Sequence, residues 1–95
     1  MKKLDIKVEM ENGDRFEVTT KTVDYLLWED TAKKHRWGSF SDSPARWEAF
    51  LGWAAIKRMG KYSGTWEEFK SAVDSVEATP VAVEPTNEVV GDASL

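Results

Sequence analysis

The stretch Pro44 to Met59, PARWEAFLGWAAIKRM, is the part of the sequence that decides the fold. Its middle is a nearly continuous apolar run from Ala49 to Ile56, far shorter than the roughly 20 residues needed to span a bilayer. Alanine, leucine, arginine, lysine and methionine dominate the stretch, and β-branched residues are nearly absent. We therefore predict a buried helix over residues 44–59 rather than a buried strand.

The apolar residues of this helix fall into two arcs on a helical wheel. One arc holds Trp47, Phe50, Leu51, Ala54 and Ala55; the other holds Ala45, Ala49, Gly52, Trp53 and Ile56. A helix that covers one side of a core needs a single apolar stripe, so a helix with two lies centrally or between two partners. Either both arcs face the protein's own core, or the second arc is left for another chain.

Length and composition limit the remaining possibilities. A chain of 95 residues forms one small domain. It has no cysteine, which excludes disulfides and thiolate metal sites, and its one histidine, His35, excludes a multi-histidine metal centre. The polar sequence after Met1-Lys2-Lys3 does not resemble a signal peptide, so we expect an intracellular protein without cofactor or metal.

Charge is distributed unevenly along the chain. Residues 1–76 carry equal numbers of basic and acidic side chains, whereas residues 77–95 carry only acidic ones. A neutral body argues against a dedicated nucleic-acid-binding protein, because such proteins depend on clustered positive charge. The later segment contains two prolines and no aromatic residue, so we expect residues 77–95 to be an acidic disordered tail.

Apolar and polar side chains alternate over residues 4–10 and again from Arg15 to Thr20, on either side of the turn sequence Glu11-Asn12-Gly13-Asp14. Period-two alternation predicts strands with one buried face, so residues 3–20 are predicted to form a β-hairpin. A lone hairpin is marginally stable in water, so its apolar face is expected to pack on the helices.

The register of this hairpin follows from its apolar face. A two-residue turn at Asn12-Gly13 would pair Phe16 with Glu9, which mixes apolar and charged side chains on one face. A three-residue loop ending in a left-handed Gly13 pairs Phe16 with Val8 instead. We prefer this second register.

A first helix is predicted over about residues 22–36. Thr20 or Thr22 can cap its start, and Asp24 in the first turn complements the helix dipole. Gly38 fits a C-terminal cap. The basic run Lys33 to Arg36 near the end could contact nucleic acid or an acidic partner, or simply complement the dipole of the helix end.

The rest of the chain contains two helix starts. Ser43-Pro44 begins the central helix, and Thr65-Trp66-Glu67-Glu68 is a capping box that begins a third helix over about residues 66–76. Within the tail, Val81-Ala82-Val83 could add a strand to a sheet edge, including a partner's. Because the tail lacks core-forming residues, its removal after Val76 is expected to leave the melting temperature nearly unchanged.

These elements give an α+β, mainly α class: an N-terminal hairpin packed on about three helices within residues 1–76. The chain lacks a phosphate-binding glycine-rich loop and a nucleophile elbow. Glu29 and Asp30 are neighbours on a helix and point apart, and nothing marks the serines near His35 as nucleophiles. We expect a binding protein rather than an enzyme.

The order of these sequence features resembles that in the tail assembly chaperones of long-tailed bacteriophages, particularly the phages that infect actinobacteria. The resemblance covers roughly residues 17–86 and rests on short blocks. These blocks are Glu29-Asp30-Thr31-Ala32, Arg36-Trp37-Gly38, the run FLGWAAIKRMG from Phe50 to Gly60, Thr65-Trp66-Glu67-Glu68-Phe69, and Glu84-Pro85-Thr86.

The resemblance implies a protein that binds the long, aggregation-prone tape measure protein in the host bacterial cytoplasm and is absent from the mature virion. It keeps that protein soluble while tail tube subunits assemble around it. It also implies a longer form made by programmed frameshift, whose extra domain recruits the major tail tube protein; residues 77–95 would be the tail of the short form.

Such a chaperone needs an apolar groove with aromatic side chains. The candidate partner-binding residues are Trp28, Trp37, Ala49, Trp53 and Ile56, and the arc with Trp53 could also mediate self-association. Two other hypotheses remain open. One is a small nucleic-acid-binding regulator that uses the basic residues at 33–36 and 57–61, and the other is a structural phage part such as a tail or head–tail connector component.

Overall fold

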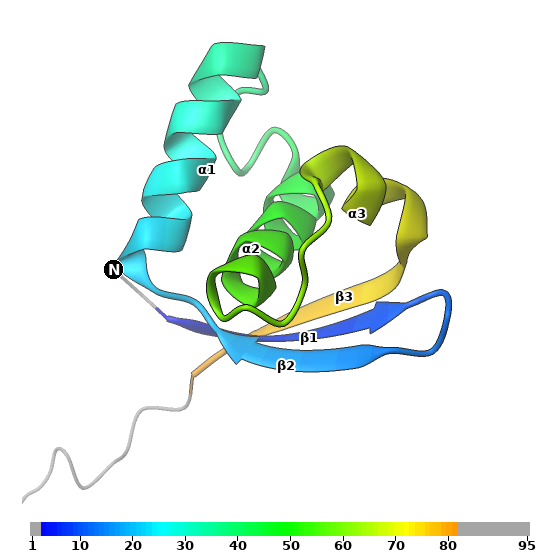
Figure 1. Ribbon diagram of the computed structural model, residues 1–95. Coiled ribbons are helices and arrows are strands. Elements are labelled where there is room, and N and C mark those ends of the chain that lie inside the picture. Colours follow the sequence, from blue (N-terminus) through cyan, green and yellow to red (C-terminus); the bar gives the residue numbers. More distant parts are fainter. Residues whose placement is uncertain (1–2, 82–95) are drawn as a thin grey trace, which may run out of the picture.

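The computed structural model describes residues 3–81. Three antiparallel strands form one sheet, α2 lies across one face of it, and α1 and α3 flank α2 (Figure 1). The predicted α+β class is confirmed. The elements are β1 Leu4–Met10, β2 Arg15–Thr19, α1 Thr22–His35, α2 Pro44–Arg58, α3 Trp66–Ala72 and β3 Val73–Pro80.

The N-terminal hairpin has the predicted register. Val8 pairs with Phe16 and Ile6 pairs with Val18. Gly13 has a φ of 96°, a left-handed conformation that glycine adopts without steric penalty. The amide of Met10 donates to the carbonyl of Asp14 over 2.8 Å and closes the three-residue loop. The apolar face of β1 is therefore directed towards the helices.

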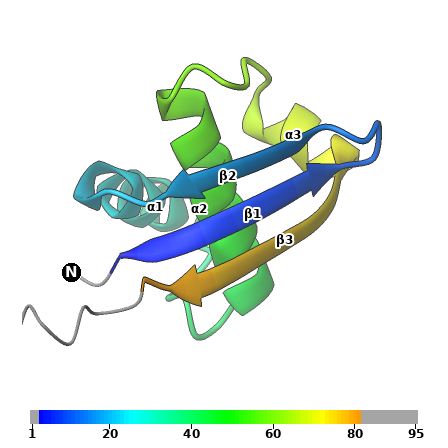
Figure 2. The ribbon, with the colours of Figure 1, turned by 90° about the horizontal axis from the view of Figure 1, so that it is seen from below.

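The third strand was not predicted, and two boundaries are corrected by it. The third helix ends at Ala72 instead of about residue 76, and residues 77–80, expected to be disordered, belong to β3. β3 pairs antiparallel with β1 and places β1 at the centre of the sheet (Figure 2). The edge of β1 that the hairpin leaves unpaired is thus paired with β3 along its length.

A β-bulge explains why the sequence suggested a helix here. Val73 pairs with Met10 and Ser75 pairs with Glu9, so one extra residue lies in β3 at this point. The bulge brings Val73 and Val76 to the same face of the strand although they are three residues apart. A spacing of three is also helical, so the pattern alone favoured continuing the helix.

The chain beyond β3 is described only to Val81. The amide of Val81 donates to the carbonyl of Lys3, at 3.2 Å. β3 thus joins the chain's own sheet, and most of the strand proposed at 81–83, with the rest of the expected tail, lies outside the described residues.

α1 begins at Thr22, close to the predicted start, but its cap differs from the prediction. Its N-cap is Lys21, and the Asp24 carboxylate accepts the Lys21 amide at 2.8 Å. Thr20 cannot cap the helix because its hydroxyl is fully buried and accepts the amide of Leu4. At the other end Arg36 adopts the left-handed conformation, two residues before the predicted Gly38.

α2 supplies most of the helical contribution to the core. A Cβ atom at Gly52 would lie only 3.1 Å from Val8 and 3.3 Å from Ile6, so the absence of a side chain lets α2 approach the sheet closely. Both arcs of α2 contribute buried residues, which favours the interpretation that they face the protein's own core. The buried residues of α2 are Phe50, Leu51, Gly52, Ala54, Ala55 and Ile56.

The strand β3 leads to a prediction about truncation that reverses the sequence-based one. Ending the chain after Val76 removes the pairs from Glu77–Lys7 to Pro80–Leu4, whereas ending it after Val81 removes no described contact. We expect the first truncation to cost about 2–4 kcal/mol, at about 1 kcal/mol per lost backbone hydrogen bond. Urea unfolding of both truncated chains checks this, and equal midpoints would contradict it.

The close approach at Gly52 predicts a strong size limit. Gly52→Val should lower the free energy of unfolding by about 1–3 kcal/mol, because three added carbons meet side chains of β1. Ala45→Val places a β-branched residue at an exposed position of the same helix and should cost less than about 0.7 kcal/mol. Chemical denaturation measures the free energy of unfolding of both variants. Similar losses in the two would show that α2 does not rest on the sheet at Gly52.

Candidate partner-binding site

Most of the aromatic side chains form a single internal cluster around Phe50. The Phe50 ring lies 5.2 Å from the rings of Trp53 and Trp66, measured between centroids. Trp28 and Trp37 contact it from the side of α1, at 5.7 Å and 6.0 Å. Aromatic pairs at these distances contribute beyond the area that they bury. The tryptophans of this cluster therefore stabilise the fold.

Two of the five predicted partner-binding residues lie largely inside the core. Ile56 is fully buried, and Trp28 is only 4% exposed although it is one of the residues that line the groove described below. Trp37, Ala49 and Trp53 are half-buried at the edge of the core. The indole N–H of Trp53 also donates to the carbonyl of Gly64, at 3.0 Å, which ties its ring to the loop before α3.

A groove with a volume of about 610 Å³ lies between α1 and the segment that leads into α2. Its floor is apolar and is built from the inner side of α1, the first residue of β1 and the start of α2. Its lining residues are Leu4, Tyr25, Trp28, Glu29, Ala32, Lys33, Arg36, Gly38, Ser39, Phe40 and Trp47.

A second aromatic group lines this groove and was missed from the sequence. Trp47 lies 5.1 Å from Phe40 and 6.3 Å from Tyr25, measured between ring centroids. Phe40 is 55% exposed, although it is a large apolar residue. Its position in the polar loop from Ser39 to Ser43 is a signal that could have marked it as a contact residue.

The rim of the groove is mainly basic. Lys33 and Arg36 line it at the C-terminal end of α1, and Glu29 is its one acidic lining residue among those described. An apolar floor with positive charge on one side suits an amphipathic segment that carries acidic residues.

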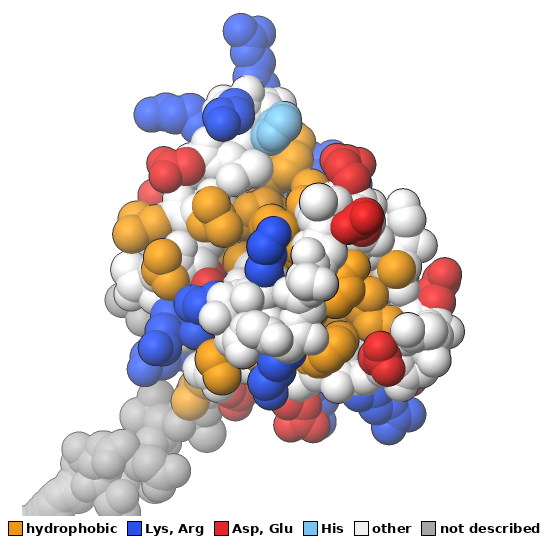
Figure 3. Space-filling model, viewed as in Figure 1, with side chains coloured by type: hydrophobic (Ala, Val, Ile, Leu, Met, Phe, Trp, Pro, Cys, Tyr) orange, Lys and Arg blue, Asp and Glu red, His pale blue; other side chains and the backbone are white. Residues whose placement is uncertain are grey.

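The outward side of α1 forms a further apolar surface. Val23, Leu26 and Leu27 are all large apolar residues that are about half exposed. Figure 3 shows hydrophobic side chains gathered over α1 beside basic ones at its end. This surface lies on α1, the helix that also forms one side of the groove. A partner that binds the groove could therefore extend over this apolar surface.

An ion pair fixes α1 to α2 and so sets one wall of the groove. Asp24 is 2% exposed, and Arg58 donates to both of its carboxylate oxygens over 3.0 and 2.9 Å. The same guanidinium also donates to the carbonyl of Thr19. Arg58 is therefore held by the fold, and Lys57 lies over the ring of Trp53, so these two basic residues do not form a free basic patch.

The Asp24–Arg58 pair gives a prediction with a control inside the same protein. Arg58→Ala leaves a buried carboxylate without its partner and should cost about 2–4 kcal/mol of unfolding free energy. Arg15 pairs with Glu9 on the surface, at 3.4 Å, and Arg15→Ala should cost less than about 1 kcal/mol. Equal losses in denaturant unfolding would contradict a structural role for the buried pair.

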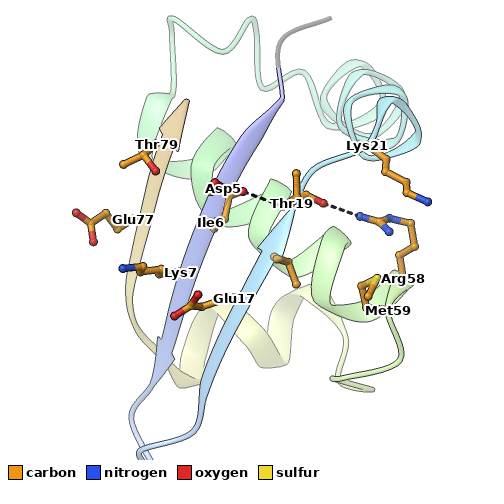
Figure 4. Close-up of a pocket in the computed structure, with 11 residues that line it drawn as sticks. Asp5, Ile6, Lys7, Glu17, Thr19, Lys21, Arg58, Met59, Glu77 and Thr79 are labelled. Atoms are coloured by element: carbon orange, nitrogen blue, oxygen red, sulfur yellow. Dashed lines mark hydrogen bonds between the residues drawn. The ribbon is translucent and has the colours of Figure 1, made fainter. Parts of the chain in front are cut away.

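The outer face of the sheet is also hollowed, with a volume of about 710 Å³, and the hollow reaches past the edge of β2 to Arg58 and Met59 at the end of α2 (Figure 4). Charged side chains of both signs, Asp5, Lys7, Glu17 and Glu77, project from its three strands. The Thr19 hydroxyl donates to Asp5 within this hollow. Among the described residues no group of three histidine or acidic side chains is placed to hold a metal ion. We interpret this face as a solvated sheet surface.

Comparisons of the chain with protein-family models, curated proteins and solved structures found no match. Within residues 3–81, none of the helices has the length and apolar character required to cross a membrane.

Proposed function

We propose that this protein is a phage tail assembly chaperone that binds the tape measure protein and keeps it soluble while the tail tube assembles. The observation that carries the proposal is the apolar groove between α1 and the segment entering α2, with the exposed ring of Phe40 at its edge. The sequence resemblance supplies the identity of the partner, and the groove supplies a surface that fits it.

The blocks behind the resemblance occupy different places in the fold. The run from Phe50 to Gly60 forms most of α2, and Thr65 and Glu68 exchange hydrogen bonds that cap α3. Phe69 of the same block is fully buried. These two blocks therefore build the scaffold, and we assign client binding to the groove that the scaffold supports.

The groove suits an amphipathic helix as client. The apolar face of such a helix would pack on Tyr25, Phe40 and Trp47, and its acidic residues would lie near Lys33 and Arg36. The contact between one client helix and one groove is weak, but a long client offers many similar segments. Copies of the chaperone bound along it would together cover its apolar surface, and any self-association would add avidity. A frameshifted longer form could then recruit the tail tube protein.

Coexpression with the tape measure protein of the same phage tests this proposal. The soluble fraction of the tape measure protein should rise several-fold when the chaperone is present. Phe40→Ser should remove most of that rise, because the exposed ring contributes contact area to the groove and little to the core.

Met59→Ser is the matched control, since Met59 is 54% exposed but does not line the groove. It should leave the soluble fraction unchanged, and circular dichroism should show both variants folded. If neither variant alters a genuine rise in solubility, the groove is not the client site. If the wild-type chain gives no rise, the chaperone proposal itself is wrong.

A further inference from the structure

The same groove has a candidate occupant within the chain. We propose that the acidic segment 82–95 binds the groove of its own molecule and competes with the client. The inference uses the groove of the proposed function but does not require the tape measure protein to be the client. It joins three observations: where the described chain ends, which charges line the groove, and which charges the segment carries.

The described chain ends beside the groove. Pro80 pairs with Leu4, and Leu4 is one of the groove's lining residues. The amide of Val81 donates to the carbonyl of Lys3, which holds the last described residue at the same end of the sheet. Figure 2 shows the end of β3 next to the start of β1. The segment therefore departs from the border of the groove.

Tethering makes even a weak contact effective. A flexible chain as long as segment 82–95 has a root-mean-square end-to-end distance of about 20 Å. A site at the root of the tether lies well inside that reach, and short tethers give effective concentrations of the order of millimolar. A contact too weak to detect between separate molecules would then be populated within one molecule.

Segment 82–95 and the groove are complementary in charge and in side-chain type. The acidic residues of the segment are Glu84, Glu88 and Asp92, and it has no basic residue. Lys33 and Arg36 line the groove near its apolar floor. Val89 and Val90 lie between two of the acids in sequence and supply apolar side chains for that floor. An acidic client would meet the same two basic residues, so segment and client cannot both bind there.

Paramagnetic relaxation in the full chain tests the proposal without any client. The sequence has no cysteine, so Ser94→Cys provides a unique position for a nitroxide label. At low salt, the amides of Lys33 and Phe40 should relax several-fold faster in the paramagnetic than in the diamagnetic sample. Added salt should reduce this enhancement, because it screens the attraction between exposed charges.

Substitutions separate docking from mere proximity. Lys33→Gln with Arg36→Gln should reduce the enhancement at Phe40 by about twofold or more, since it removes the attraction. Lys61→Gln with Lys70→Gln makes the same change in net charge away from the groove and should leave it unchanged. An equal enhancement in both double variants would overturn the proposal. So would an equally large enhancement in a mixture in which the nitroxide and the isotope label are on separate molecules, because the contact would then be between copies.

Discussion

The close contact between α2 and the sheet at Gly52 is the constraint on which the rest of the structure depends. Ile6 and Val8 of β1 and Val76 of β3 all come within van der Waals distance of the position that a Cβ would occupy. Because the helix lies this close, its remaining faces are available to α1 on one side and α3 on the other. A small chain thus obtains a nearly continuous core from one central helix.

The aromatic residues are divided between the core and the groove by this arrangement. Phe50 is at the centre of the core group, where Trp28 and Trp66 enclose it. Tyr25 and Trp47 lie where α1 and α2 diverge, and Phe40 approaches them from the intervening loop. The groove is therefore a consequence of how far α1 stands from the start of α2, and the Asp24–Arg58 pair holds the two helices together near the opposite end of α2.

Local patterns in the sequence predicted the elements that local chemistry determines. The hairpin register followed from placing Phe16 opposite Val8, and the cap of α3 followed from Thr65 and Glu68. The strand β3 could not be predicted in this way, because its bulge gives Val73 and Val76 a helical spacing and its partner β1 is distant in sequence. Pairing with a free strand edge overrode the local pattern.

The candidate site was harder to predict, because an apolar arc on a wheel does not show what covers it. Ile56 and Trp28 are candidate partner contacts by sequence, yet tertiary packing buries Ile56 fully and leaves Trp28 only 4% exposed. Phe40 lies in a loop without periodicity, so no sequence pattern marks it, yet it is among the most exposed large apolar residues described. Only the approach of that loop to Trp47 in three dimensions reveals the groove.

An NMR titration of the isotope-labelled chain with a helical segment of the tape measure protein tests directly whether the groove binds the proposed client. If the groove is the client site, the side-chain signals of Tyr25, Phe40 and Trp47 move on binding, while the indole signal of Trp53, whose N–H donates to the Gly64 carbonyl, stays in place. Movement of the Trp53 indole with no change at the groove would contradict client binding in the groove.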